Sequence, residues 1–200
     1  MIKILKKTKK NKNKIFLKSS LINIQIFFID TIFIIPKKIK IFSRKNFLFF
    51  ETSLGLLSLK FINNIYFFIK KNKLLINFNL LKKKSILNLY TKLIKIKIKG
   101  VLQGFKIKLI LKGIGFKTFI ENDNLILKLG FSHNIIITIP STIHINNQNN
   151  ILIFSSIDYL LLSQFVYYIK NYKKPEPYKG KGLVIPNEFF FLKEGKKSKK

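Results

Sequence analysis

Residues 173–182 combine side chains that bind phosphate with residues that stiffen the backbone. They read Lys-Lys-Pro-Glu-Pro-Tyr-Lys-Gly-Lys-Gly. Pro175 and Pro177 fix φ and cannot continue a helix, so we expect an extended, pre-ordered segment. The lysines supply charge, the glycines let main-chain N–H groups approach an anion, and the tyrosine can stack on a base. The sequence therefore predicts a phosphate-binding segment, in which Glu176 pairs with a neighbouring lysine.

A second group of candidate residues is Gly130-Phe131-Ser132-His133. From the residues alone, the plain interpretation is a turn that the glycine opens, with Phe131 packed inward. The two histidines, His133 and His144, have no nearby carboxylate or cysteine in the sequence to suggest a metal site or a catalytic triad. We predict no catalytic residues, no metal and no cofactor.

Composition indicates a polyanionic partner. The chain of 200 residues carries 39 basic and 8 acidic residues, a formal charge of +31, and would repel itself unless a polyanion neutralised it. Arg44 is the only arginine, so affinity would depend on the number of lysines rather than on bidentate contacts. The absence of cysteine excludes disulfides, thiolate nucleophiles and cysteine-containing zinc sites. An enzyme acting on single-stranded nucleic acid is disfavoured because carboxylate clusters for a metal are missing.

The N-terminal residues allow a rival interpretation. A lysine-rich stretch precedes an apolar run at residues 21–35, as in a membrane anchor, but the run is polar at Asn23, Gln25 and Asp30 and is shorter than the roughly 20 residues that span a bilayer. We expect this run to be core strand and residues 1–20 to order only on a partner. The alternative function is a polybasic peripheral protein on an anionic membrane surface.

The elements that must position these residues are strands and two helices. Short apolar stretches separated by turn residues predict antiparallel strands at residues 39–42, 47–50, 56–61, 65–69 and 74–78, then at 105–112, 116–121, 125–129, 135–139 and 151–154. The sequence Asn122-Asp123-Asn124 predicts a tight turn, and Gly113 with Gly115 a hairpin glycine pair, since the third glycine of a dinucleotide fingerprint is missing.

The two helices differ in how clearly the sequence marks them. Residues 82–100 fit a helix face through Ile86, Leu89, Tyr90, Leu93 and Ile94, but residues 94–99 alternate as a strand would. For the second helix we expect Ser155 or Ser156 as N-cap, with Ser155 and Asp158 in a capping-box arrangement, and an end near Tyr172. Its predicted apolar face contains Ile157, Leu160, Leu161, Phe165, Tyr168, Ile169 and Tyr172.

The string Lys-Pro-Glu-Pro-Tyr-Lys-Gly-Lys-Gly resembles the closing signature of the bacterial-type large-subunit ribosomal protein six family. The block from Gln103-Gly104-Phe105 through Gly113-Ile114-Gly115-Phe116 to Leu129-Gly130-Phe131-Ser132-His133 is similar to that family in order and spacing. The resemblance extends over residues 100–182, is weaker over 33–100, and implies a helix at 82–100. It also implies an α+β fold of two tandem similar domains, each a mostly antiparallel sheet with a helix packed on it, plus basic termini.

These boundaries divide the chain into four parts: an N-terminal extension at 1–30, α+β domains at 31–103 and 104–174, and a C-terminal rRNA-binding extension at 175–200. The resemblance implies a structural role in the large ribosomal subunit, near the sarcin–ricin loop and the region where translation factors dock. The expected rRNA-binding residues are Lys173, Lys174, Tyr178, Lys179, Gly180, Lys181, Gly182, Ser132, His133, Lys196, Lys197, Lys199 and Lys200.

The expected partners are large-subunit rRNA, neighbouring large-subunit proteins and, indirectly, translation factors, with no small-molecule substrate and no membrane. A bacterial-type signature in a chain rich in Ile, Lys, Asn and Phe, as AT-rich codons would give, favours a mitochondrial, organelle-encoded protein. A plastid-type organelle or an AT-rich bacterium remains an alternative.

Overall fold

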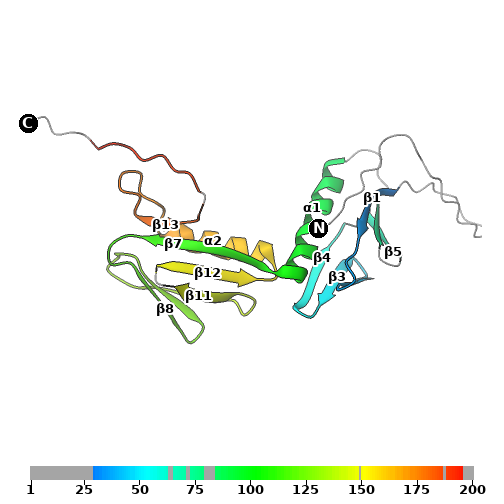
Figure 1. The fold of residues 1–200 in the computed structure, drawn as a ribbon, viewed down its shortest axis with the longest axis horizontal. Coiled ribbons are helices and arrows are strands. Elements are labelled where there is room, and N and C mark those ends of the chain that lie inside the picture. The colour runs from blue at the N-terminus through cyan, green and yellow to red at the C-terminus, as the bar shows by residue number, and fades with distance from the viewer. Residues whose placement is uncertain are drawn as a thin grey trace, which may run out of the picture. The chain divides into compact units, whose positions relative to one another are not determined.

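The computed structural model describes residues 29–62, 65–70, 73–78, 84–148, 150–186 and 188–195. Contacts divide the chain into two compact units, Met1–Leu102 and Gln103–Lys200. Each contains antiparallel sheets and a helix (Figure 1), so the predicted α+β class is confirmed.

The first unit contains two three-stranded sheets. One has the order β1-β6-β5, with β1 at Ile29–Ile34, β6 at Lys73–Phe78 and β5 at Ile65–Lys70. The other has the order β2-β3-β4, with β2 at Lys40–Arg44, β3 at Phe47–Thr52 and β4 at Gly55–Lys60. All pairings are antiparallel, and these strands lie where the apolar stretches predicted them. Residues 21–28 of the expected N-terminal strand lie outside the described residues.

Helix α1 spans Lys84–Gln103, so residues 94–99 are helical, as expected from the resemblance. Tyr90, Ile94, Ile98 and Val101 are buried, whereas Leu89 of the predicted face is exposed. Gly100 lies inside the helix, and the helix ends before Gly104, whose φ of 69° is the left-handed conformation that commonly follows a helix. The hydroxyl of Thr52 donates to the carbonyl of Val101 at 2.8 Å and ties β3 to the last turn.

The second unit contains a four-stranded sheet, β11-β12-β7-β13, and a three-stranded sheet, β10-β9-β8. The strands are β7 at Phe105–Lys112, β8 at Lys117–Glu121, β9 at Asn124–Lys128, β10 at Ile135–Thr138, β11 at His144–Gln148, β12 at Ile151–Ser156 and β13 at Gly182–Val184. Asn122 and Asp123 both have positive φ in the two-residue turn between β8 and β9, which confirms the tight turn. Strands β11 and β13 were not predicted.

Helix α2 spans Tyr159–Tyr172 and contacts β7 and β12 of the four-stranded sheet (Figure 1). Its N-cap is Asp158, whose carboxylate accepts from the N–H of Leu160 at 3.1 Å, so the predicted Ser155 or Ser156 cap is wrong. Ser155 instead donates to the carbonyl of His144 on β11 at 3.3 Å, and the Ser156 hydroxyl accepts from the N–H of Asp158 at 3.3 Å.

The buried face of α2 also differs from the prediction. It consists of Leu162, Val166, Ile169 and part of Lys170, with Phe165 packed at its side. The predicted face residues Leu160, Leu161, Tyr168 and Tyr172 are exposed. Because α2 carries apolar residues nearly all round, apolar spacing alone does not identify the side that meets the sheet.

Candidate nucleic-acid interface

Residues 173–183 form a closed loop that begins where α2 ends and leads into β13. The N–H of Leu183 donates to the carbonyl of Lys173 at 2.9 Å, and the N–H of Glu176 donates to the carbonyl of Lys181 at 2.8 Å. The N–H of Gly180 donates to the carbonyl of Glu176 at 2.9 Å across the tip. Two prolines and three main-chain hydrogen bonds thus hold the loop, which we call the lysine loop, in one shape. Pro177, Tyr178 and Lys179 are exposed at its tip.

Both glycines of the lysine loop are required by its own backbone. Gly180 has φ 67°, and Gly182 has φ 145°. A Cβ on Gly182 would lie 2.6 Å from the carbonyl oxygen of Lys174, closer than real Cβ atoms come to backbone. Close approach of main chain to main chain therefore explains Gly182, while the N–H of Gly180 is already bonded within the loop.

The first residue of the lysine loop contacts the second candidate motif. The ammonium of Lys173 lies 4.6 Å from the centroid of the Phe131 ring, and the Phe131 ring stacks beside the His133 ring with centroids 6.2 Å apart. Phe131, Ser132 and His133 are all exposed, so the interpretation of Phe131 as packed inward is wrong. The fold brings together two motifs about 40 residues apart in the sequence.

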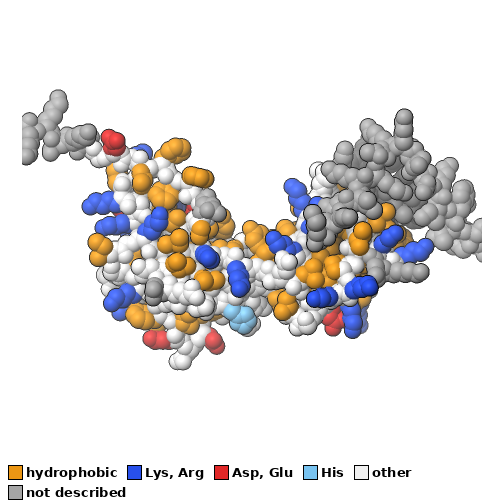
Figure 2. Space-filling view, in the orientation of Figure 1, with side chains coloured by type: hydrophobic (Ala, Val, Ile, Leu, Met, Phe, Trp, Pro, Cys, Tyr) orange, Lys and Arg blue, Asp and Glu red, His pale blue; other side chains and the backbone are white. Residues whose placement is uncertain are grey.

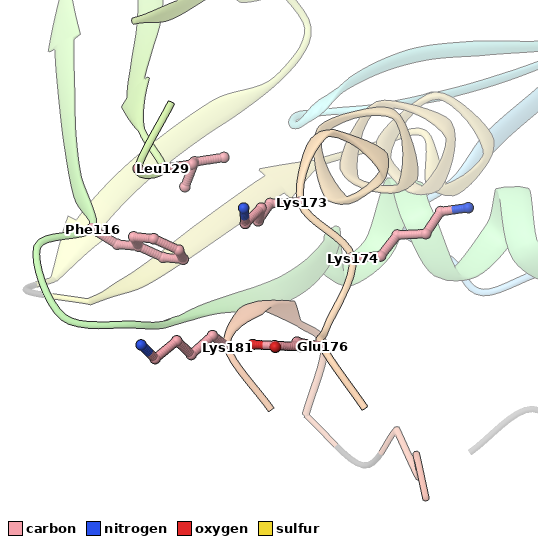
Figure 3. A pocket seen from close by; sticks show the side chains of 7 residues that line it. Phe116, Leu129, Lys173, Lys174, Glu176 and Lys181 are labelled. Atoms are coloured by element: carbon pink, nitrogen blue, oxygen red, sulfur yellow. The ribbon is translucent and has the colours of Figure 1, made fainter. Parts of the chain in front are cut away.

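A shallow pocket of about 450 Å³ lies between these motifs. It is lined by Phe116, Leu129, Gly130, Lys173, Lys174, Glu176 and Lys181. Figure 3 shows the Lys173 side chain extending toward Phe116 and Leu129, whereas Lys174 points the other way. An apolar wall faced by ammonium groups suits a sugar or base edge with phosphates at its rim.

Phe116 forms the apolar wall because Gly113 leaves space for its ring. A Cβ on Gly113 would come within 2.8 Å of the ring, whereas one on Gly130 would lie 3.5 Å from it, at an ordinary van der Waals distance. The segment with Gly113 and Gly115 joins β7 to β8, which belong to different sheets, so the predicted hairpin glycine pair is wrong. Gly113 is instead a packing position for Phe116.

The residues after β13 fold back over the lysine loop. Lys170 of α2 forms an ion pair with Glu188, and Lys112 of β7 lies 5.7 Å from the centroid of the Phe190 ring. The N–H of Lys193 donates to the carbonyl of Pro177 at 2.8 Å. Residues 188–195, which we call the return segment, are thereby fastened at three points to the unit that carries the loop.

Positive charge dominates the surface around the loop. Lys174, Lys179 and Lys181 are exposed, and Lys173 is half-buried. Figure 2 shows lysine and arginine side chains spread over the visible faces of both units with few acidic ones between them. Glu176 is exposed, and among the described residues no ion pair joins it to a lysine, so its expected pairing is not found.

Two tyrosines lie on the exposed side of α2, one turn before the loop. Their hydroxyls, on Tyr168 and Tyr172, are hydrogen-bonded. This bond raises the pKa of Tyr172 above its ordinary value of 10.0. Among the described residues, no cluster of three or more histidine, cysteine, aspartate or glutamate side chains could hold a metal ion. In the same part of the chain, neither helix has the length and apolar character needed to cross a bilayer.

The structure places the predicted site residues in one region of the second unit, except for four. Lys196, Lys197, Lys199 and Lys200 lie outside the described residues. Sequence reasoning missed the contributions of Phe116, Phe131 and the return segment. The Gly-x-x-Phe spacing of Gly113 and Phe116 was visible, but the contact of Phe131 with Lys173 depends on tertiary structure.

Comparison with known proteins places these motifs in one family. The family model described as ribosomal protein L6 matches residues 112–183, which include the lysine loop and the Phe131 motif. The large ribosomal subunit protein uL6 of Karelsulcia muelleri is 42% identical over 123 residues, 59% of this chain and 68% of the relative. The chain belongs to the ribosomal protein L6 family.

Other L6-family relatives come from bacteria and from an organelle. The protein uL6 of Chlorobium limicola is 42% identical over 117 residues, 58% of this chain and 65% of the relative. The form uL6c of Phaeodactylum tricornutum is 38% identical over 117 residues, 58% of this chain and 66% of the relative. The similarity thus spans about two thirds of the relatives' length. Members of the L6 family are structural proteins rather than enzymes, which confirms the prediction that this chain is not an enzyme.

Proposed function

We propose that the chain is a structural component of a large ribosomal subunit that binds large-subunit rRNA through the lysine loop and the adjoining Phe131–His133 motif. The observation that carries this proposal is the contact between Lys173 and the Phe131 ring, which joins the two L6-family motifs into one surface. That surface combines ammonium groups for phosphates with exposed rings for bases, the two kinds of contact that RNA recognition uses.

The division of roles within the surface follows from exposure. Lys174, Lys179 and Lys181 reach solvent and would neutralise phosphates, while Tyr178 at the tip would stack on a base. Gly180 and Gly182 would act indirectly, by allowing the loop its closed shape. The Ser132 hydroxyl would donate a hydrogen bond to the same RNA, and the His133 ring would stack on it. Lys196, Lys197, Lys199 and Lys200 would add electrostatic attraction.

In this proposal the rRNA partner is the region near the sarcin–ricin loop, and translation factors are affected only through that RNA. The relatives are proteins of bacterial and organellar ribosomes. A mitochondrial ribosome is proposed on composition, and a plastid-type ribosome is the alternative that the organellar relative favours. Family membership does not favour the peripheral membrane protein.

Co-sedimentation in detergent tests the proposal. Tagged full-length protein, expressed in the cells of origin, is followed through a sucrose gradient after membranes have been dissolved. We expect it in the large-subunit fractions, and expect RNase treatment to release it. Recovery at the top of the gradient with RNA intact would contradict the ribosomal role. Recovery with lipid before detergent, and release by detergent alone, would support the membrane alternative.

A further inference from the structure

The return segment presents two phenylalanine rings almost entirely to solvent. Phe189 is 98% exposed and Phe191 is 96% exposed. Rings this exposed touch almost nothing in the described part of the chain, so both faces of each ring are accessible. A phenylalanine that only fills an apolar surface would bury one face against its own chain.

The segment that carries these rings is nonetheless held in place. Phe190 and Leu192 point toward the lysine loop, since a Cβ on Gly180 would lie 3.4 Å from the Phe190 ring and 3.6 Å from Leu192. The ion pair of Glu188 with Lys170 and the hydrogen bond from Lys193 to Pro177 fix the two ends. The two exposed rings are thus presented at a fixed position next to the lysine loop.

Phe189 and Phe191 are the two most exposed apolar side chains of the return segment, and the half-buried Phe190 lies between them. Side chains that alternate along a chain indicate an extended backbone, in which residues two apart lie about 6.6 Å from each other. This backbone spacing is about twice the 3.4 Å repeat of stacked bases, which leaves room for one base between side chains carried two residues apart.

We propose that Phe189 and Phe191 grip an unpaired base of RNA by stacking, while lysines of the neighbouring loop contact its backbone. The charge around the rings favours RNA over a protein partner, because Lys179, Lys181 and Lys193 are exposed near the segment and protein interface cores are depleted of lysine. Stacking on aromatic rings is the usual way in which proteins bind bases displaced from a helix. This inference rests on the proposed rRNA binding and assigns it a second contact.

The test compares full-length variants on two RNA probes. One probe is a transcript of the sarcin–ricin region with its unpaired loop bases, and the other is a blunt, fully paired duplex of similar length. The variant Phe189→Leu/Phe191→Leu removes the rings but keeps apolar side chains. The matched control is Ile114→Ala, which removes an apolar side chain that is 95% exposed on the same unit. Thermal unfolding confirms that each variant folds as wild type does.

We expect the double phenylalanine variant to bind the looped transcript about ten-fold more weakly, to bind the duplex as wild type does, and to keep the wild-type salt dependence. The Ile114 variant should bind both probes normally. Equal binding of wild type and the double variant to the looped transcript would overturn the stacking inference and leave the proposed function standing. If the double variant binds RNA normally yet fails to enter large subunits, the two rings contact a protein partner and not a base. If wild type binds neither probe, the proposed rRNA binding fails first.

Discussion

Gly182 and Gly115 both have positive φ, but only Gly182 has backbone atoms where a side chain would begin. A Cβ on Gly182 would meet the carbonyl of Lys174 at 2.6 Å, whereas nothing lies within 4 Å of a Cβ on Gly115. The two positions therefore separate the cost of backbone strain from the cost of a steric clash. From the sequence, Gly182 was expected to let the main chain approach an anion. The contact with Lys174 could not be expected, since it exists only once the loop has closed.

We predict that Gly182→Ala destabilises the second unit by about 2 kcal/mol or more, because backbone has to move. Gly115→Ala should cost about 1 kcal/mol, the penalty of a left-handed conformation alone. Urea unfolding of both variants measures the difference. Equal losses of stability would show that the closed shape of the lysine loop does not depend on Gly182.

Tertiary structure also decides which way the Phe131 ring points and what it contacts. Its position after Gly130 permitted either an inward or an outward ring, and the sequence holds no signal that Lys173 will lie 4.6 Å away. The two motifs could each be found from residue types and spacing. Their junction could not, since it depends on how α2 and the β9–β10 connection pack on the same unit.

At the scale of elements, α2 positions the lysine loop, and its start is set by Asp158. The carboxylate accepts from the free N–H of Leu160 and lies at the positive end of the helix dipole. Ser155 occupies a similar place in the sequence but bonds to β11 instead. The capping pattern therefore indicated the correct region and the wrong residue, because an extra two residues of β12 extend past the predicted strand end.

We predict that Asp158→Ala lowers the free energy of unfolding by about 1 kcal/mol and that Ser155→Ala lowers it by less than half as much. Chemical denaturation followed by circular dichroism checks the ranking. A larger loss at Ser155 would restore the serine cap and contradict the observed start of α2.

The return segment depends on the pairing of Glu188 with Lys170, whose side chain is largely buried at the end of α2. Glu188→Gln would leave that ammonium without its carboxylate. We expect a loss of about 1–2 kcal/mol, since the glutamate itself remains partly solvated. Limited proteolysis should also cut the return segment faster than in wild type.

The matched control for this change is Glu194→Gln, which removes the same charge from an exposed position on the same segment. It should leave stability and cleavage unchanged. If both variants are cleaved at the wild-type rate, the ion pair does not hold the return segment in place.

At the scale of the whole molecule, two units each with antiparallel sheets and a helix could be expected from the resemblance and from the apolar stretches. The strands with clear apolar runs were found, whereas β11 reads His-Ile-Asn-Asn-Gln and β13 has three residues, so neither produces an alternating pattern long enough to detect. Strand β13 adds an edge to the sheet of the second unit through pairing with β7, a partner distant in sequence. Such pairing cannot be inferred from local propensity.

The N-terminal boundary gives a prediction about the whole chain. Among the described residues, strand β1 begins at Ile29 and pairs with β6 as far as Ile34, so the pairing seen in the first unit involves residues from 29 onward. Deleting residues 1–27 should therefore leave the cooperative unfolding of both units intact. Loss of the unfolding transition of the first unit would show that the apolar run before residue 28 is part of its core.

We propose that the lysine loop itself contacts rRNA, beyond the attraction exerted by a chain of charge +31. A salt series on the sarcin–ricin transcript separates the two. Replacing Lys179 and Lys181 by Ala removes two loop charges, and replacing Lys40 and Lys60 by Ala removes the same charge from exposed strands of the first unit.

We expect the slope of log K against log salt to fall by about one per lysine in the loop variant and to change little in the strand variant. Equal slopes for the two variants would mean that the lysines act only through net charge. That result would contradict the assignment of the lysine loop as the rRNA-binding site.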